Sequence, residues 1–289
     1  MKFIFFGSPE FAAIILEKLI KASLLPQAVA CNPDKPVGRK KIITPPPTKL
    51  VIRNQKIENG IEILQPEKLD NHLITQLLNH KPDFFIVAAY SKIIPKEILE
   101  IPHFGTIGIH PSLLPKHRGP TPIQTAILNG DKETGTTLFL MDEKIDHGLI
   151  LATSHLPITT NDNYETLMRK LAELSANLLI ETLSNIKEKI KNAKPQNESE
   201  ATYTKKFKTE DAFINPEDLE KTQKGEGKTA AEIDRKIRAL NPEPGTFTVI
   251  KGKRIKLLEA KIKDNKLKLV KIQKEGKKPQ IINNFIESL

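Results

Sequence analysis

Short apolar runs that alternate with amphipathic segments fill the first half of the chain, and this alternation constrains the fold more than any other feature. Each run is bounded by turn residues, which is typical of buried strands. The segment SPEFAAIILEKLIKA, at 8–22, has a serine cap, an early proline and apolar residues three and four apart, so it predicts a helix. Strands are predicted at 2–7, 26–31, 82–90 and 105–110, with another helix within 62–80. The pattern predicts an α/β fold with a doubly wound, mostly parallel, Rossmann-like sheet.

The remaining sequence predicts further strands, a long helix and a separate small domain. The segments 137–143 and 149–158 resemble a hairpin pair, and 163–190 has the apolar spacing of one long amphipathic helix. A polar, charged stretch follows and predicts a linker, after which a helix at 229–240 precedes short alternating strands. Such strands predict a β-barrel of the oligonucleotide-binding (OB) type. The expected division is a catalytic domain at 1–188, a linker at 189–205 and an OB-like domain at 206–289.

The positive charge of the chain lies mainly in this C-terminal part. From Lys205 onward, 21 lysines and arginines face 13 acidic residues, whereas the earlier residues carry 24 basic against 22 acidic side chains. A basic segment of this kind indicates a polyanionic partner, and nucleic acid is favoured over a membrane because no strongly apolar helical face accompanies the lysines. A solvated lysine-rich surface is the alternative interpretation.

Several classes of protein are disfavoured by what the sequence contains. The turn GSPEF at Gly7 lacks the spacing of a dinucleotide-binding motif, and the sequence contains no Walker A pattern. The single cysteine, Cys31, excludes a disulfide framework and a cysteine-based zinc cluster. The apolar start of the chain is too short for a signal peptide, and no apolar stretch approaches the roughly 18 residues of a membrane span. We therefore expect a cytoplasmic protein that does not bind a membrane. No metal is expected, and a monomer is expected because the sequence indicates no exposed apolar helix.

The segment GTIGIHPSLLPKHRGPTPIQ, at 105–124, places His110 at the point where a predicted strand gives way to a rigid loop. Ligands of open α/β sheets collect beyond the carboxyl ends of the strands, so a titratable group there is a candidate for chemistry. Asp142, Asp146 and His147 occupy a second loop between two predicted strands. A carboxylate beside an imidazole orients the ring and favours its charged form, which can stabilise an oxyanion. The alternatives are a histidine that caps a turn and an aspartate that stabilises one.

Together these segments resemble the formyltransferases that use 10-formyl-tetrahydrofolate. The resemblance rests on IHPSLLPKHRGPTPIQTAILNGDKETGTTLFLMDEKIDHG, with FFGSPEFA, NPDKPVGRKKIITPPPTK and VAAYSKIIP before it and AAEIDRKIRALNPEPGTFT and KRIKLLEA after it. The SLLP loop followed by RGP-x-PIQ is specific to this superfamily. The basic first loop and the tail are similar to those of the members that formylate methionyl initiator tRNA.

The resemblance implies a site and a reaction. His110 and Asp146 match two of three catalytic residues: the histidine would stabilise the oxyanion formed when the neutral α-amine of methionyl-tRNA attacks the formyl carbon, and the aspartate would hold the imidazole charged. The residues that match the folate-binding segments are Ser112, Leu113, Leu114 and Pro115 of the loop, and Ile86, Val87, Ala88, Ala89, Tyr90 and Asp142 around the pterin.

The third catalytic position departs from the family pattern. The family usually has asparagine two places before the histidine, and here that place is Gly108. Glycine has no side-chain donor, and loss of one oxyanion donor costs roughly 10²–10³ in turnover in other enzymes. Either water, a backbone amide or another side chain substitutes at this place, or the chemistry is weakened.

Two basic stretches are candidates for contact with tRNA. Arg39, Lys40 and Lys41 follow a glycine and precede three prolines, so this loop could place its cations on the phosphates of an acceptor stem. The alternative is a mobile surface loop with a solvated charge run. Arg118, just beyond the SLLP loop, could bind substrate phosphate or could instead pin the loop by bonding to backbone carbonyls.

Two other functions compete with formylation of methionyl-tRNA. One is a formyltransferase of the same superfamily that acts on an amino sugar or on glycinamide ribonucleotide. The basic first loop and the basic tail disfavour it, because a small substrate needs neither. The other is a catalytically impaired relative that binds tRNA through its tail, which Gly108 favours and the retained His110, Asp146 and SLLP loop disfavour.

Overall fold

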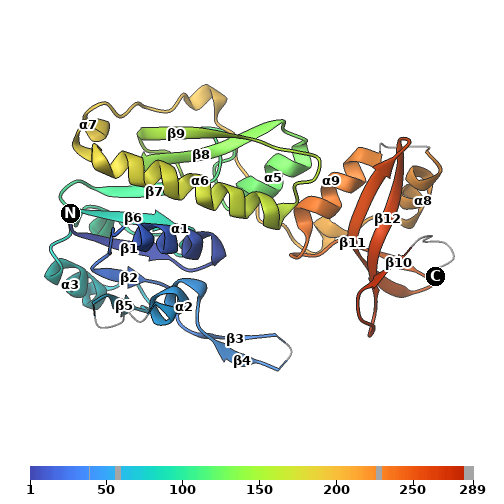
Figure 1. Cartoon of the computed structure of the whole chain (residues 1–289), viewed down its shortest axis with the longest axis horizontal. Coiled ribbons are helices and arrows are strands. Elements are labelled where there is room, and N and C mark those ends of the chain that lie inside the picture. The colour runs from blue at the N-terminus through green and yellow to red at the C-terminus, as the bar shows by residue number, and fades with distance from the viewer. Residues whose placement is uncertain (39, 56–59, 226–229, 283–289) are drawn as a thin grey trace. The chain divides into compact units, whose positions relative to one another are not determined.

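The computed structural model describes residues 1–38, 40–55, 60–225 and 230–282 (Figure 1). They form two compact units. The first contains Met1–Gly119, Thr134–Pro157 and Met168–Tyr203, and the second contains Pro120–Glu133, Ile158–Leu167 and Thr204–Leu289. Arg39, one of the residues predicted to contact tRNA, lies outside the described residues. The domain boundaries drawn from the sequence stay a prediction.

The first unit is built on a seven-stranded sheet. In order across the sheet the strands are β5 (Glu62–Leu64), β2 (Ala28–Ala30), β1 (Phe3–Gly7), β6 (Phe84–Ala88), β7 (Thr106–His110), β8 (Glu133–Leu140) and β9 (Ile150–Pro157). The first five strands run parallel and β8 pairs antiparallel with β7. The predicted mostly parallel, doubly wound sheet is confirmed, and it has the crossover order of such folds.

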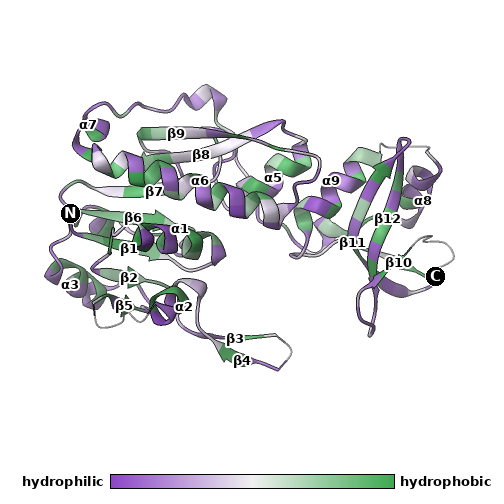
Figure 2. Ribbon diagram, in the orientation of Figure 1, coloured by the Kyte–Doolittle hydropathy of each residue, from purple (hydrophilic) through white to green (hydrophobic). Residues whose placement is uncertain are grey.

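The central strands are apolar because both of their faces are buried. All five residues of β1, β6 and β7 are buried, and Figure 2 shows hydrophobic colour along β1 and β6. Parallel strands with both faces covered read as continuous apolar runs rather than as alternating ones. Phe3 of β1 stacks on Phe84 of β6 with 5.5 Å between ring centroids. The core of the first unit therefore lies along the strands whose carboxyl ends carry the predicted site.

The helices predicted within 8–22, 62–80 and 163–190 are present in the first unit, the last of them with a break, and the described residues also contain short helices that the sequence did not indicate. The helices of this unit are α1 (Glu10–Lys21), α2 (Pro47–Asn54), α3 (Asn71–Asn79), α4 (Lys96–Leu99), α6 (Tyr164–Ser184), which begins in the second unit, and α7 (Ile186–Lys191). The prediction of one continuous helix at 163–190 is wrong in one respect. Asn185, with φ −128° and ψ 32°, separates α6 from α7. In α6, Ser175 shares a hydrogen bond with Thr136 of β8, so this helix packs against the sheet.

A two-stranded antiparallel hairpin rises from the loop after β2, where the sequence indicated only a basic loop. It consists of β3 (Lys35–Val37) and β4 (Ile42–Thr44). Gly38, with φ +71°, begins its tip, and the amide of Lys41 donates to the carbonyl of Gly38 at 3.1 Å. The prolines that follow lead directly into α2.

The second unit is built on a four-stranded antiparallel sheet. Its strands are β10 (Phe247–Ile250), β11 (Lys253–Lys263), β12 (Lys266–Lys274) and β13 (Gln280–Ile281), and its helices are α5 (Pro122–Asn129), α8 (Pro216–Lys224) and α9 (Ala230–Leu240). Figure 2 shows hydrophilic and hydrophobic residues alternating along β11 and β12. Inward residues such as Leu257, Leu267 and Ile272 form a core with α8 and α9, so the predicted C-terminal β-rich fold is confirmed.

None of the helices in the described part of the chain has the length and apolar character to cross a membrane.

Candidate functional site

The last residue of β7 is His110, which is 6% exposed. The strand is parallel to β6, and the register pairs Ala88 at the end of β6 with Ile109. The carboxyl ends of these strands therefore meet at one edge of the sheet, where ligands of such folds bind. The sequence predicted this position for His110.

Both ring nitrogens of His110 face oxygen acceptors. Nε2 donates to the carbonyl oxygen of His117 at 2.8 Å, and Nδ1 lies 3.6 Å from Oδ2 of Asp146. A ring that is protonated on both nitrogens satisfies both acceptors together, whereas a neutral ring satisfies only one. The pair therefore offers a buried donor whose orientation is set by a carboxylate, which is the arrangement needed to stabilise a developing oxyanion.

Asp146 lies in the loop between β8 and β9 and has a left-handed backbone with φ +49°. Its Oδ2 accepts a hydrogen bond from the amide of Gly119 at 2.7 Å. A residue other than glycine rarely holds this conformation without support from its surroundings. The structure therefore brings together His110 and Asp146, as the resemblance implies, and braces both with the segment from His117 to Gly119.

The third predicted catalytic position, Gly108, is covered by an aromatic ring. Gly108 pairs with Phe139 across β7 and β8, and Phe139 is 2% exposed. A Cβ added to Gly108 would lie 2.5 Å and 2.6 Å from Cε1 and Cζ of Phe139 and 2.9 Å from Cγ of Met141. The space that an asparagine side chain would enter is therefore filled by Phe139, which the sequence did not single out.

The SLLP loop is fixed from inside by β8 and by its own backbone. The hydroxyl of Thr137 donates to the carbonyl of Ser112 at 2.7 Å and accepts from the amide of Leu114 at 3.1 Å. The Ser112 hydroxyl is buried and donates to the carbonyl of Lys116 at 2.6 Å. Leu113 and Pro115 are half-buried. The side chains of Leu113 and Pro115 can thus meet a ligand, whereas Ser112 serves to hold the loop.

The residues predicted to border a pterin occupy β6 and the turn after it. Ile86, Val87 and Ala88 are buried within the strand, Ala89 is exposed with φ +48°, and Tyr90 is half-buried. The Tyr90 ring packs edge-on against Phe6 at 5.5 Å. Its hydroxyl is buried and has no hydrogen-bond partner among the described residues. Burial raises the pKa of Tyr90 to about 12, so this hydroxyl stays neutral and can meet a polar atom of a ligand.

Cys31, at the end of β2, is buried and inert. Burial is the main cause that raises the pKa of its thiol to about 11. The thiolate is the reactive form of cysteine, so a thiol of this kind is not a nucleophile at neutral pH.

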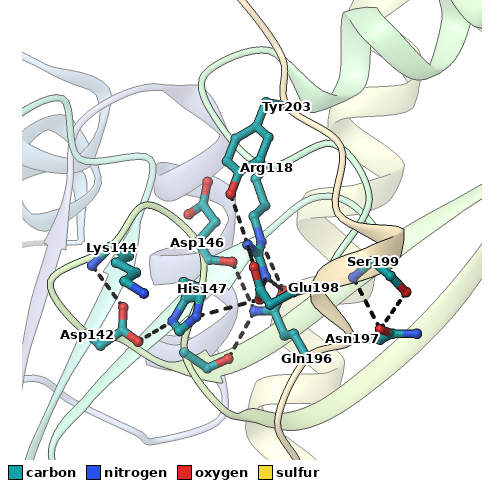
Figure 3. A network of polar contacts seen from close by, with 11 residues as sticks. Arg118, Asp142, Lys144, Asp146, His147, Gln196, Asn197, Glu198, Ser199 and Tyr203 are labelled. Atoms are coloured by element: carbon teal, nitrogen blue, oxygen red, sulfur yellow. Dashed lines mark hydrogen bonds and ion pairs between the residues drawn. The ribbon is translucent and has the colours of Figure 1, made fainter.

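Arg118 is fully buried, and Figure 3 shows its guanidinium inside a network of polar side chains. It donates to Oε1 of Gln196 at 3.1 and 2.7 Å, to both carboxylate oxygens of Glu198 at 3.0 and 2.6 Å, and to the Tyr203 hydroxyl at 3.1 Å. The hydrogen bond from Arg118 lowers the pKa of Glu198, and the pKa of Arg118 is raised in turn. The tRNA-binding role considered for Arg118 is therefore corrected: its donors are buried against protein acceptors. These bonds agree with the alternative considered for Arg118, in which it pins the loop, and here the partners are the side chains of Gln196, Glu198 and Tyr203.

Asp142 forms a separate pair beside this network. Its Oδ2 accepts from Nδ1 of His147 at 2.6 Å, and its Oδ1 accepts from the amide of Lys144 at 2.9 Å. Nε2 of His147 lies 3.5 Å from Oε1 of Glu198, as Figure 3 shows. Asp142 is thus held at the edge of the loop that carries Asp146.

Lys40 and Lys41 lie exposed at the tip of the β3–β4 hairpin. The base of the hairpin is anchored by Lys49, which bonds to Asp34 at 2.9 Å and to Gln65 at 2.6 Å. The amide of Gln65 also donates to Asp34 at 2.8 Å, and these bonds lower the pKa of Asp34. The basic tip is therefore presented by a hairpin with a rigid base.

The second unit contains a cleft of about 1270 Å³. It is lined by residues of α5, α9, β11, β12 and the segment 158–165, and none of the predicted catalytic residues contributes to it.

Comparison with known families matches the chain in two parts. Residues 1–183 match the family described as formyl transferase, and residues 227–267 match the family described as formyl transferase, C-terminal domain.

Individual proteins are similar over nearly the whole chain. A methionyl-tRNA formyltransferase of Caldicellulosiruptor saccharolyticus is 36% identical over 99% of this chain and 96% of its own length. Among solved structures, a methionyl-tRNA formyltransferase from Clostridium thermocellum has a TM-score of 0.62 at 21% identity, covering 98% of this chain and 100% of that one. An N-formyltransferase from Helicobacter canadensis, in complex with folinic acid and dTDP-3-aminofucose, has a TM-score of 0.65 at 20% identity, covering 91% of this chain and 88% of that one.

Proposed function

The chain belongs to the methionyl-tRNA formyltransferase family, and from this membership we propose that it transfers a formyl group from 10-formyl-tetrahydrofolate to the α-amine of methionyl initiator tRNA. The observation that carries the chemistry is the pair of buried His110 and half-buried Asp146, 3.6 Å apart at the carboxyl edge of the sheet. We infer that the chain acts as a monomer in the cytoplasm.

Each residue of the pair has a distinct role in the proposed reaction. Bound 10-formyl-tetrahydrofolate supplies the formyl group. A ring N–H of His110 donates to the formyl oxygen while negative charge develops on it, in the manner of an oxyanion hole. The carbonyl of His117 accepts a hydrogen bond from Nε2 of His110, so a substrate oxygen would compete for a donor that is already oriented. Asp146 keeps the ring in place and accepts, through water, the proton that the attacking amine releases. That proton passes to N10 of the folate as the bond between N10 and the formyl carbon breaks, so that neutral tetrahydrofolate leaves.

The residues around the pair suit a folate. The buried hydroxyl of Tyr90 offers a neutral donor and acceptor that no described residue uses. Leu113 and Pro115 offer half-buried apolar surface on a loop that Thr137 holds rigid. A few oriented polar groups within an apolar wall are typical of sites for small ligands. We infer that these residues, with Asp142 and the strand from Ile86 to Ala88, border the pterin.

Two lysine-rich surfaces support a tRNA substrate over an amino sugar. Lys40 and Lys41 extend from the anchored hairpin, and cross-strand pairs in the second unit place Lys261 opposite Lys268 and Lys263 opposite Lys266. All four of these sheet lysines are exposed. Like charges directly opposite on a sheet are destabilising by a few tenths of a kcal/mol, up to about 1 kcal/mol. A polyanion that lies across the sheet would relieve this repulsion.

A single assay tests the proposed function against its rivals. The protein is incubated with 10-formyl-tetrahydrofolate and either methionyl initiator tRNA, a dTDP-amino sugar or glycinamide ribonucleotide, and the formylated product is identified by mass spectrometry. We expect formyl-methionyl-tRNA with turnover and no product from the small amines. Formylation of either small amine in preference to tRNA would replace the proposal, and tRNA binding without turnover would indicate the impaired relative.

For the lysines of β11 and β12 we predict that substitution weakens tRNA binding but slightly raises thermal stability. Replacing both Lys261 and Lys268 by Ala should raise KM for tRNA several-fold and leave KM for the folate unchanged. The slope of log Kd for tRNA against log salt should fall by about two, one for each lost phosphate contact. The melting temperature should rise slightly, because the cross-strand repulsion is removed.

Lys21 on α1, whose side chain is 65% exposed, provides a matched control. Lys21→Ala should change neither KM nor the salt slope. An unchanged salt slope in the Lys261/Lys268 double variant would contradict a nucleic-acid role for this surface.

A further inference from the structure

The segment 194–203, predicted as part of a linker, instead lies against the catalytic loops. At its start, the backbone of Lys194 exchanges two hydrogen bonds with Ile150, at 2.7 and 3.0 Å. At its end, the carbonyl of Thr202 accepts from the amide of Arg118 at 2.8 Å, and its hydroxyl accepts from the amide of His117 at 2.8 Å. We refer to residues 194–203 as the strap, because both of its ends are tied to the loops that carry the site.

Between these two attachments, Gln196 connects the two catalytic loops. Its Nε2 donates to the carbonyls of both Asp146 and Gly148, each at 2.9 Å. Its Oε1 accepts two hydrogen bonds from Arg118. Gln196 is 9% exposed. Its side-chain amide donates two hydrogen bonds and accepts two, so all of its hydrogen-bonding positions are occupied. Figure 3 shows this side chain between Arg118 and the backbone at Asp146.

The contacts of Gln196 act on the backbone that aims the catalytic carboxylate. Asp146 has φ +49°, and a Cβ added at the neighbouring Gly148 would lie 1.6 Å from the carbonyl oxygen of Leu140. The turn therefore packs closely against β8, and Asp146 holds a backbone conformation that is uncommon for a residue other than glycine. Gly119, next to Arg118, donates to the Asp146 carboxylate, and His117, on its other side, accepts from His110. Arg118 and Gln196 thus connect the turn at Asp146 to the segment that contacts both catalytic side chains.

We propose that Gln196, held by Arg118 and by the strap, is a positioning residue that sets the orientation of Asp146 relative to His110. This inference rests on the proposed formyltransferase reaction. It assigns a catalytic purpose to a segment outside the matched catalytic part of the chain, which ends at residue 183. A displacement of about 1 Å between reacting groups can lower turnover about 100-fold.

Two substitutions remove the donors of Gln196 while preserving its volume. Gln196→Glu keeps acceptors for Arg118, and Gln196→Met removes the polar atoms without adding charge. Each variant should lower kcat about 10- to 100-fold, with KM for folate and for tRNA within about threefold of the wild-type values. In the Asp146→Asn background, the same substitutions should change kcat by less than about twofold, because residues that act as a unit are not additive.

Asn197→Ala is the matched control, because the side chain of Asn197 lies in the strap and its oxygen accepts from the amide and hydroxyl of Ser199, within the strap and away from Asp146. It should retain wild-type kcat. A second readout is independent of turnover: amide hydrogen exchange of Gly119, whose N–H bonds to Asp146, should accelerate in Gln196→Met while exchange in β1 stays unchanged.

The outcomes separate this inference from the proposed function. Wild-type kcat in both Gln196 variants, an equal loss in the Asp146→Asn background, or unchanged exchange at Gly119 would overturn the positioning role. An inactive wild-type protein would instead overturn the proposed reaction, and the exchange of Gly119 would still test whether Gln196 holds Asp146.

Discussion

Replacing His110 by Ala is expected to lower kcat by about 10²–10³, the loss seen when an oxyanion donor is removed from other enzymes. Asp146→Asn should cause a loss of similar size, because it removes the charge that faces Nδ1 of His110 at 3.6 Å. An asparagine oxygen can still accept from the amide of Gly119, so this variant tests the charge with little change of shape. Both substitutions should lower kcat and kcat/KM equally, since both residues act in the transition state. Steady-state formylation assays with methionyl-tRNA measure these constants.

Two residues outside the pair provide controls for these variants. Glu143 lies in the same loop as Asp146 but pairs with Lys96 at 2.9 Å, and His103 is an exposed histidine of the first unit. Glu143→Gln and His103→Ala should therefore retain kcat within about twofold, as surface substitutions usually do little. Circular dichroism and melting curves establish that the variants fold. Wild-type turnover in either His110→Ala or Asp146→Asn would remove the pair from the proposed mechanism.

The strands and the position of His110 could be predicted from the sequence because the signal is local. Continuous apolar runs predicted β1, β6 and β7, and the change from TIGI to a proline-rich loop predicted where β7 ends. The approach of Asp146 to His110 has no local signal, since 36 positions separate them, and it was implied only by the family resemblance. Within α6 and α7, the apolar spacing continued past Asn185, so the break between them was missed.

The strap and the hairpin were missed for a common physical reason. Their contacts join polar side chains to backbone atoms or to buried charges, and hydropathy patterns carry no information about such partners. From the sequence, Gln196 and Glu198 were assigned to a linker. In the structure Gln196 is buried and Glu198 binds the buried Arg118. Lys49 likewise reads as one of many surface lysines, yet it is 9% exposed and paired with Asp34. Buried polar networks must be found in the structure because their partners are distant in sequence.

Gly108→Asn is expected to lower kcat about tenfold or more and to destabilise the fold, although it restores the residue that the family usually has at this position. The reason is Phe139, whose ring atoms would lie 2.5 and 2.6 Å from the new Cβ. The ring is 2% exposed, so it cannot move into solvent without opening the core beside His110. Overpacking of this kind costs typically 1–3 kcal/mol. Thermal melting measures the destabilisation, and formylation with saturating folate and tRNA measures kcat.

A second substitution tests whether Gly108 and Phe139 form one unit. Phe139→Val alone should destabilise the protein, because it leaves a cavity over Gly108. The combination of Gly108→Asn with Phe139→Val should be less destabilising than the sum of the two single effects, since the smaller side chain makes room for the asparagine. If this double variant also exceeds the kcat of Gly108→Asn, the asparagine amide has regained access to the site. A tenfold rise of kcat in Gly108→Asn alone would contradict the steric argument, and would mean that the natural glycine limits the reaction.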